Sequence, residues 1–231
     1  MALCIEWIGH STFKLLGSKI IYIDPWKIPE TLCDGDIILL SHIHHDHFSP
    51  HDIKKIAKEP WNVFGPADVV KELGSGTVLN PGDSTVMESI SITAIPSYTI
   101  NKLFHPKEKN WIGFYIIIDG IKIYYAGDSD FIPEMKNLKP VDIALLPIGG
   151  KFTMNADEAA AAANRIFPAT AIPYHWGDII GTKNDAELFA ENCECKTIIL
   201  DPGEVLEILE NHLVGNCRKE RPIHRMLHIW K

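Results

Sequence analysis

The first third of the chain alternates short apolar runs with turn residues, a pattern that predicts β-strands. We expect strands at residues 5–8, 12–16 and 19–23, with the turn Gly17-Ser18 between the second and the third. The continuous apolar stretch 37–40 predicts a further strand that is buried on both faces. This part of the chain is therefore expected to form a sheet.

The rest of the chain mixes strand patterns with two helix patterns. Ser49-Pro50 predicts a helix start, with the serine as N-cap and the proline in the first turn, and the helix continues through 52–58. Asp119-Gly120 predicts a hairpin turn between two apolar strands. Further strands are expected in segments 89–95, 113–119, 121–128, 142–150, 170–175 and 196–203, and a second helix at 155–167 capped by Asn155. Strands in both halves with helices between them predict an α/β fold of packed sheets covered by helices.

Composition limits the class of protein. The 231 residues are 46% hydrophobic and 23% charged, which is typical of a globular chain, and no linker or repeat interrupts them, so we expect one domain over 1–231. No apolar run approaches a membrane span, and the N-terminus lacks the features of a signal peptide, so we predict a cytoplasmic protein with no membrane partner. The net charge of −8 argues against a nucleic-acid partner, and we interpret the basic segment 217–225 as a solvated tail.

Candidate chemistry is concentrated in the segment that follows the strand at 37–40. The segment reads Ser-His-Ile-His-His-Asp-His and holds four of the 11 histidines, together with an aspartate. In extended backbone His42 and His44 point to the same side, whereas Asp46 and His47 are adjacent and can diverge toward a second position. Neutral imidazoles suit zinc, iron or manganese. The segment therefore predicts a metal site, and it can serve two cations a few ångströms apart.

Two further strand ends carry metal-affine side chains. Asp128 follows an apolar strand and a glycine that allows close backbone approach, and His175 ends another strand. Taken alone, each has a plain structural alternative, namely a turn aspartate and a histidine satisfied in the core. Together with the histidine segment they favour an open site built from the ends of several strands.

With these residues in place, the sequence resembles the metallo-β-lactamase superfamily. The family motif His-x-His-x-Asp-His matches His42, His44, Asp46 and His47, and the later family aspartate and histidine match Asp128 and His175. The opening phrases WIGHSTFKL and IYIDP resemble the small metal-dependent hydrolases related to ascorbate-6-phosphate lactonase. The resemblance implies a four-layer αβ/βα sandwich of two mixed sheets flanked by helices, with the site at one edge.

The resemblance also implies ligand roles. His42 and His44 would bind a first metal, and Asp46, His47 and His175 a second, with Asp128 bridging and with Asp46 and Asp128 as catalytic residues. Zn²⁺ is the expected ion, as one or two ions, with Mn²⁺ or Fe as alternatives. The residues expected around the ligands, to orient them or to contact substrate, are His10, Asp24 and Tyr98.

One position departs from the family pattern. The family supplies a third histidine to the first metal, and Tyr98 stands where that histidine is expected. His105 is the only histidine between residues 52 and 127, and it is either the missing ligand or a substrate contact near the metals, with a surface position as a third possibility.

The predicted function is a metal-dependent hydrolase. A bound cation lowers the pKa of water and so supplies hydroxide, which would cleave an ester, lactone, amide or phosphoester. The partner would be a small molecule, and Lys107 and Lys109 favour a negatively charged one unless they form only a solvated basic loop. Two alternatives stay open, an iron-dependent oxidoreductase on the same fold and a metal-stabilised binding module without catalysis. The oligomeric state is not predicted.

Overall fold

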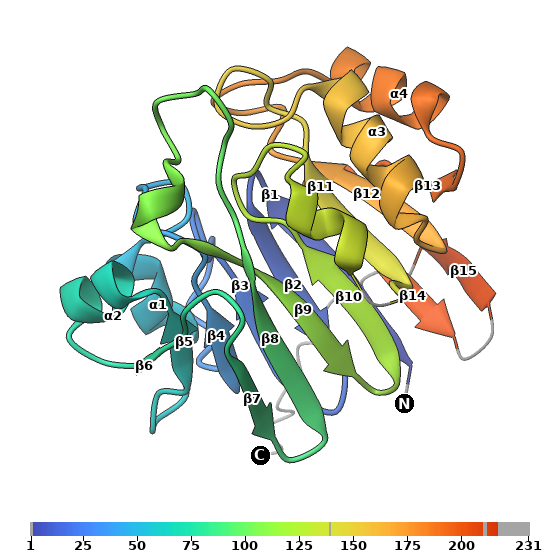
Figure 1. The fold of residues 1–231 in the computed structure, drawn as a ribbon. Helices are drawn as coiled ribbons and strands as arrows, with labels where there is room; N and C mark the ends of the chain where they lie inside the picture. The colour runs from blue at the N-terminus through green and yellow to red at the C-terminus, as the bar shows by residue number, and fades with distance from the viewer. Residues whose placement is uncertain (1, 139, 210–211, 217–231) are drawn as a thin grey trace, which may run out of the picture.

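The computed structural model describes residues 2–138, 140–209 and 212–216. The predicted solvated tail at 217–225 lies outside the described residues. Among those described, the chain forms two sheets that pack face to face (Figure 1).

The first sheet has eight strands in the order β15-β14-β1-β2-β3-β4-β5-β6. It is mixed, because β14, β1, β2 and β3 pair antiparallel whereas β3, β4, β5 and β6 pair parallel. Its strands are β1 (Leu3–Gly9), β2 (Thr12–Leu16), β3 (Ile20–Ile23), β4 (Ile37–Leu39), β5 (Val63–Gly65), β6 (Thr77–Val78), β14 (Glu204–Leu209) and β15 (His212–Asn216).

The second sheet has seven strands in the order β13-β12-β11-β10-β9-β8-β7 and is also mixed. Strands β10 to β13 run parallel, and β7 to β10 are antiparallel neighbours. Its strands are β7 (Ser84–Met87), β8 (Ile90–Pro96), β9 (Ile112–Ile118), β10 (Ile121–Tyr125), β11 (Ile143–Pro147), β12 (Thr170–Tyr174) and β13 (Lys196–Thr197).

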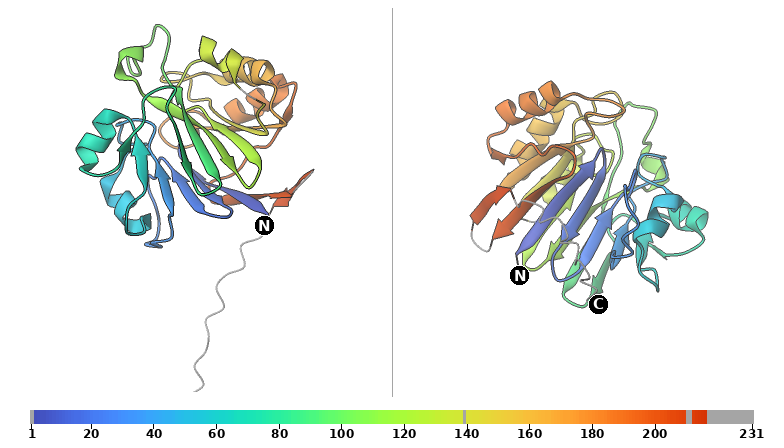
Figure 2. Two further views of the ribbon diagram at one scale, coloured as in Figure 1. Left: turned by 60° about the horizontal axis from the view of Figure 1, so that its bottom comes forward. Right: turned by 180° about the vertical axis from the view of Figure 1, so that it is seen from behind.

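Helices cover the outer faces of both sheets, as Figures 1 and 2 show. Helices α1 (Pro50–Ile56) and α2 (Ala67–Leu73) lie beside β4 and β5, and α3 (Ala156–Ile166) and α4 (Lys183–Asn192) cover β11 and β12. Two short 3-10 turns, η1 (Lys107–Lys109) and η2 (Pro133–Asn137), lie in connections of the second sheet. The predicted α/β sandwich of two mixed sheets flanked by helices is confirmed.

The burial of β3 and β4 explains why their sequences read as continuous apolar runs. Ile21 and Ile23 face the core between the two sheets, whereas Tyr22 and Ile38 face a second core that includes Ile53 of α1. A parallel strand with covers on both faces must be apolar at every position, not at alternate ones. The end of β4, from which the histidine segment continues, is therefore packed on both faces.

The predicted caps are present, but several predicted boundaries are wrong. The Ser49 side chain accepts from the backbone N–H of Asp52, and Asn155 forms a reciprocal capping box at the start of α3. Helix α1 ends at Ile56 and not at residue 58, because Ala57 turns to extended backbone and bridges Gly35. Only Lys196–Thr197 of the segment 196–203 pairs as a strand, at the edge of its sheet.

The two sheets are joined at the edge where β4, β10 and β12 end. The backbone N–H of His175, after β12, donates to the carbonyl of His10 in the turn between β1 and β2 (3.0 Å). The N–H of Ile112, at the start of β9, donates to the carbonyl of Ser41 after β4 (3.2 Å). These links bring residues far apart in sequence to one edge.

None of the helices in the described residues has the length and apolar character of a membrane span.

Candidate metal centre

A first group of three imidazoles gathers beyond the end of β4. The Nδ1 atom of His44 lies 3.1 Å from Nε2 of His42 and 3.1 Å from Nε2 of His105. His42 and His44 come from the segment after β4, whereas His105 arrives from the loop between β8 and β9. Three nitrogen atoms so close together, from two separate segments, form a preassembled donor set for one cation.

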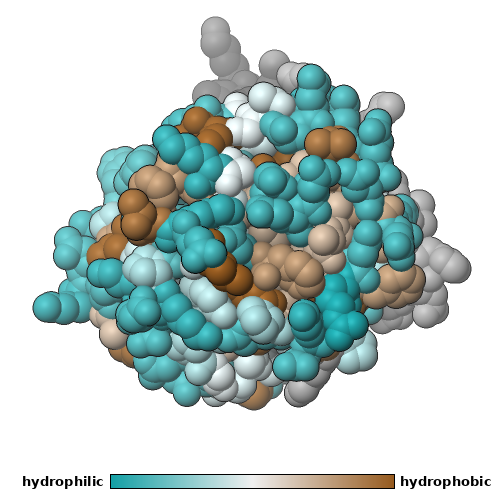
Figure 3. All heavy atoms as spheres, turned by 45° about the horizontal axis from the view of Figure 1, so that its top comes forward, coloured by the Kyte–Doolittle hydropathy of each residue, from teal (hydrophilic) through white to brown (hydrophobic). Residues whose placement is uncertain are grey.

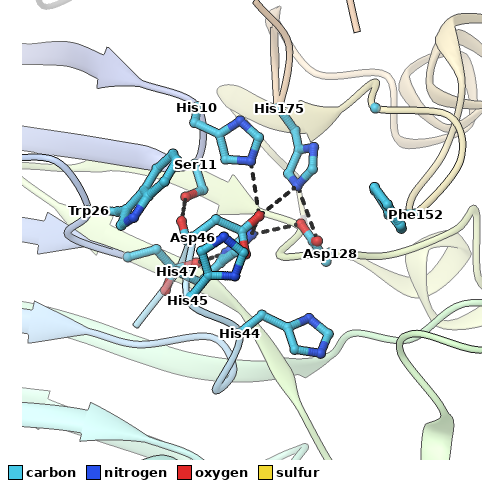
Figure 4. Close-up of polar contacts among 12 residues, drawn as sticks. His10, Ser11, Trp26, His44, His45, Asp46, His47, Asp128, Phe152 and His175 are labelled. Atoms are coloured by element: carbon cyan, nitrogen blue, oxygen red, sulfur yellow. Dashed lines mark hydrogen bonds and ion pairs between the residues drawn. The ribbon is translucent and has the colours of Figure 1, made fainter. Parts of the chain in front are cut away.

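A second group lies beside the first. Oδ2 of Asp46 is 3.6 Å from Nε2 of His175 and 3.8 Å from Nε2 of His47. His10 completes the group, because its Nε2 atom lies 3.0 Å from the same Asp46 oxygen. Figure 4 shows these side chains converging on Asp46 from separate elements. The mixed donor set of imidazoles and a carboxylate suits a second divalent cation.

Asp128 lies between the two groups. Its Oδ2 atom is 3.2 Å from Nε2 of His105 in the first group and 3.2 Å from Nε2 of His175 in the second. Its Oδ1 atom is 3.1 Å from Nε2 of His47. Asp128 follows β10 after Gly127, which has φ +66° and where a Cβ atom would lie 2.7 Å from Oγ of Ser97. Glycine therefore permits the turn that places this carboxylate.

Several buried polar atoms of the cluster lack a hydrogen-bond partner among the described residues, and this is the test of whether the residues fit a metal. They are Nδ1 of His10, Nε2 of His47, both ring nitrogens of His175 and Oδ1 of Asp128. A buried polar atom without a partner costs about 1–3 kcal/mol. Nε2 of His47, Nε2 of His175 and Oδ1 of Asp128 are the atoms that face the shared space, so cations that accept their lone pairs would remove this cost. The residues fit a pair of metal ions.

Asp24 fixes the orientation of ligands in both groups. Its buried Oδ2 atom accepts hydrogen bonds from Nδ1 of His47 (2.7 Å) and from the hydroxyl of Ser41 (2.5 Å). The Ser41 oxygen in turn lies 2.9 Å from Nδ1 of His42. With the protons of the neutral rings on the two Nδ1 atoms, the Nε2 atoms would be free to ligate a cation. Such partners of metal ligands set the tautomer and the ring orientation.

The carbonyl of Phe152 fixes the ring orientation of His105, the third imidazole of the first group. Nδ1 of His105 donates to this carbonyl at 3.1 Å. His105 is also buried, with 2% of its surface exposed. The structure thus places His105 among the candidate ligands and not at the surface, which favours the ligand interpretation over the substrate contact.

The two groups differ in protonation. Burial, together with the neighbouring His105, lowers the pKa of His44 to about 4, and burial also holds the pKa of His42 well below its ordinary value. Burial opposes charge on His175 and His47 as well, but Asp128 outweighs it, raising the pKa of His175 to about 9 and that of His47 well above its usual range. His42 and His44 are therefore neutral at pH 7, whereas His47 and His175 hold protons that compensate the buried carboxylates.

The carboxylates have the complementary shifts. Burial alone would raise the pKa of Asp46, but His10 and His175 outweigh it and hold this pKa well below its usual range. Burial is likewise outweighed at Asp128, where His175 and His47 keep the pKa low. A site with this much buried negative charge requires compensation, either by protons on imidazoles or by metal cations that replace them.

Three residues of the centre have left-handed backbone, which is uncommon outside glycine. The φ angles are +47° at His10, +45° at Asp24 and +65° at His175. Each such residue costs about 1–3 kcal/mol and is retained where the surroundings over-determine it. Gly149 provides the space for His175, since a Cβ atom there would lie 2.6 Å from Nδ1 of the histidine.

Tyr98 is the one predicted site residue that the structure does not bring to the cluster, and that expectation is wrong. Its hydroxyl donates to Oε2 of Glu134 (2.9 Å) and accepts from Nζ of Lys107 (3.2 Å). Lys107 is itself paired with Glu134 at 2.9 Å. Nζ of Lys109 lies over the Trp111 ring, 5.9 Å from its centroid. Neither lysine lines the pocket at the centre, so these two side chains do not provide a site for a negatively charged substrate there.

A pocket of about 240 Å³ opens directly onto the centre. The ligand side chains form one wall, and Phe104, Phe152 and Ile179 form the other. His45 also lines it and is exposed, because the segment turns it toward solvent at the mouth. The sequence does not single out the three apolar residues, because nothing local distinguishes an aromatic residue at a pocket from one in a core.

Fold and site together define a metallo-β-lactamase-type protein, and comparison with known sequences gives the family. Residues 4–175 match the model of the β-lactamase superfamily domain. A protein of Thermococcus onnurineus named UPF0173 metal-dependent hydrolase is 33% identical over 227 residues, covering 88% of this chain and 99% of the relative. The chain belongs to the β-lactamase superfamily and, within it, to this family of metal-dependent hydrolases.

Solved structures agree with the assignment. A candidate metal-dependent hydrolase of Parabacteroides distasonis is similar with a TM-score of 0.76 and 32% identity, covering 85% of this chain and 92% of that one. Igni18, a metallo hydrolase of Ignicoccus hospitalis, shares the fold with a TM-score of 0.77 at 24% identity, covering 91% of this chain and all of that one.

Proposed function

We propose that this chain is a dinuclear metal hydrolase that cleaves a carbonyl or phosphoryl bond in a small molecule. The observation that carries the proposal is Asp128, whose Oδ2 atom lies 3.2 Å from an imidazole of each donor group. A single structural metal requires four ligands, whereas here two groups of donors share one carboxylate beside an open pocket. Esters and lactones are the first compounds to examine.

The first group would hold one ion through His42, His44 and His105, and the second group would hold the other through Asp46, His47 and His175. Zn²⁺ suits both groups, since imidazole and carboxylate are its ordinary nitrogen and oxygen ligands, and Mn²⁺ and Fe are the alternatives. When bound, such ions lower the pKa of water and polarise the oxygen of the scissile group.

The chain's own residues orient and transfer protons around that chemistry. Asp46 borders the pocket, and its Oδ2 atom accepts a hydrogen bond from Nε2 of His10. It is therefore placed to orient an attacking water molecule or accept its proton. Asp24 keeps the Nδ1 protons of His42 and His47 in place, so these rings present lone pairs to the centre.

We also propose a cytoplasmic location and a small-molecule partner, without nucleic acid. No disulfide joins the cysteines of the described residues, which is expected in a reducing compartment. The net charge of −8 opposes binding to a phosphate backbone.

Elemental analysis of protein purified without a histidine tag, combined with turnover of an ester and lactone panel, tests the proposal. We expect about two zinc or manganese ions per chain, and loss of both metal and turnover in Asp128→Ala. His51→Ala is the matched control, because His51 is an exposed histidine on α1, outside the centre. Its metal content and activity should equal those of the unmodified protein.

The same measurement separates the alternatives. If the protein contains one or two iron ions, shows a redox response and hydrolyses nothing in the panel, it is an oxidoreductase and not a hydrolase. Metal bound at full stoichiometry with turnover of neither kind would indicate a binding module. Unchanged hydrolysis in Asp128→Ala would contradict the proposed centre.

A further inference from the structure

The wall of the pocket opposite the metal ligands is apolar and uncharged. Phe104 and Phe152 pack edge to face, with ring centroids 4.7 Å apart, and Ile179 completes the wall. Figure 4 shows Phe152 beside Asp128, on the side away from His10 and Trp26. A molecule whose reacting group lies over Asp128 therefore extends its remaining atoms against this wall.

The apolar wall continues to the surface. Phe104 is 44% exposed and Ile179 is 43% exposed, although both are large hydrophobic residues. Figure 3 shows hydrophobic residues gathered near the middle of this end of the molecule, within a largely hydrophilic face. Half-exposed apolar side chains at the rim of a pocket are typical of a binding groove, because a ligand removes them from water.

The lysines of the surrounding loops also leave the pocket without an added positive charge. Among the described residues that line the pocket there is no lysine or arginine. Lys102, in the same loop as Phe104, is held by Asp130 at 2.5 Å and by the carbonyl of Thr153 at 2.6 Å. Lys151 is not among the lining residues, and its Nζ atom lies over the Phe152 ring, 5.1 Å from the centroid. Apart from the metal centre itself, the described lining therefore offers no lysine or arginine that could recognise an anionic group.

We infer that the substrate is an uncharged ester, lactone or amide with a short apolar acyl chain, which binds against Phe104, Phe152 and Ile179. This inference rests on the proposed function and names its substrate class. The pocket has a volume of about 240 Å³, below the roughly 300–1,000 Å³ that is usual for drug-sized ligands, so it suits a short chain. Longer chains reach the exposed rim, where each further methylene is less completely buried.

Binding of acyl hydroxamates to the metal-loaded protein, measured by calorimetry from acetyl to octanoyl, tests the inference. Each methylene buried should lower Kd about fourfold, and this gain in affinity should become smaller once the chain extends past the wall to the exposed rim. In Phe152→Ala and in Ile179→Ala, each added methylene should lower Kd by a smaller factor. The backbone carbonyl that holds His105 is retained in Phe152→Ala, so its metal content should stay unchanged, and elemental analysis checks this.

Leu103→Ala is the matched control, because Leu103 is 93% exposed in the same loop but does not line the pocket. Its chain-length dependence should equal that of the unmodified protein. A Kd independent of chain length would overturn the inference. So would a preference for succinyl over butyryl hydroxamate, which would indicate an anion site.

A second assay separates this inference from the proposed function. Hydrolysis of nitrophenyl esters of the same acyl series reports on the reaction, whereas hydroxamate binding reports on the wall. If the affinity for hydroxamates depends on chain length but no ester or lactone is hydrolysed, the proposed function is refuted. The inferred binding of an acyl chain to the apolar wall is then supported. Ester hydrolysis with equal kcat/KM for all chain lengths would support the proposed function and refute the apolar wall.

Discussion

The replacement of Asp24 by asparagine tests how the protein orients its metal ligands. Asp24 is fully buried, and its two carboxylate oxygens accept four hydrogen bonds. Oδ1 accepts from the backbone N–H of Ser41 at 2.7 Å, and Oδ2 accepts from Ser41 Oγ, His47 Nδ1 and the Tyr125 hydroxyl. Asparagine has nearly the same shape but only one acceptor oxygen.

The geometry decides which contact is lost in Asp24→Asn. A backbone N–H cannot rotate, so the amide oxygen of the introduced asparagine would stay with Ser41 and its NH₂ group would occupy the Oδ2 position. There it faces Nδ1 of His47, which must then become an acceptor and move its proton to Nε2. A protonated Nε2 cannot ligate a cation. Loss of such an orienting partner typically lowers metal affinity 10- to 100-fold, or about 1.4–2.7 kcal/mol.

A zinc competition titration with a chromophoric chelator measures this change. Asp24→Asn should bind the ion of the second donor group, which His47 would hold, 10- to 100-fold less tightly. Asp34→Asn is the matched control, since Asp34 also accepts from a tyrosine hydroxyl, that of Tyr22, at 2.8 Å, but lies outside the donor groups. Its metal affinity should not change. Equal affinity of Asp24→Asn and the unmodified protein would refute the argument that Asp24 sets the tautomer of His47.

Four further outcomes are expected. His105→Ala should reduce metal content from two ions to one, since it removes one of three donors of the first group; two tightly bound ions would show that His105 is no ligand. Gly149→Ala should weaken zinc binding in the same titration, because the new Cβ would lie 2.6 Å from Nδ1 of His175, and normal affinity would mean that the ring can move freely. Asn155→Ala should lower the free energy of unfolding in urea by about 1 kcal/mol through loss of the α3 cap, with metal content unchanged; altered metal content would contradict a purely local role. Removal of metal by a chelator should lower Tm, because ions at a free concentration of 100 times Kd stabilise the fold by about 2.7 kcal/mol, and an unchanged Tm would argue against a metal that binds only the folded chain.

Several elements of the structure are not among those predicted from the sequence, and the reasons differ. Helix α4 begins at a capping box formed by Thr182 and Asp185, a signal that the sequence does carry. Helix α2 has no side-chain cap, since Pro66 precedes it, and Val69 is its one buried residue, so no apolar face marks it in the sequence. Strands β6 and β7 are short and largely exposed, so no buried face marks them.

The sequence by itself determined the strand that delivers the histidine segment, the two predicted helix caps and the candidate ligands at three strand ends. These features depend on residues close together in the chain, whose spacing fixes which side chains share a face. The family resemblance added the sandwich fold and the order of the ligands, and the structure bears out the fold.

Only the tertiary structure decided which groups meet across the edge of the two sheets. It brought His105 to the first donor group, paired Tyr98 and Lys107 with Glu134, and placed Phe152 against the pocket. No local pattern encodes such contacts, because each depends on how segments distant in sequence pack in space, such as the loops of His105 and Phe152, which are 47 residues apart. Whether a lysine is free to bind an anion depends on the carboxylate that packing places beside it.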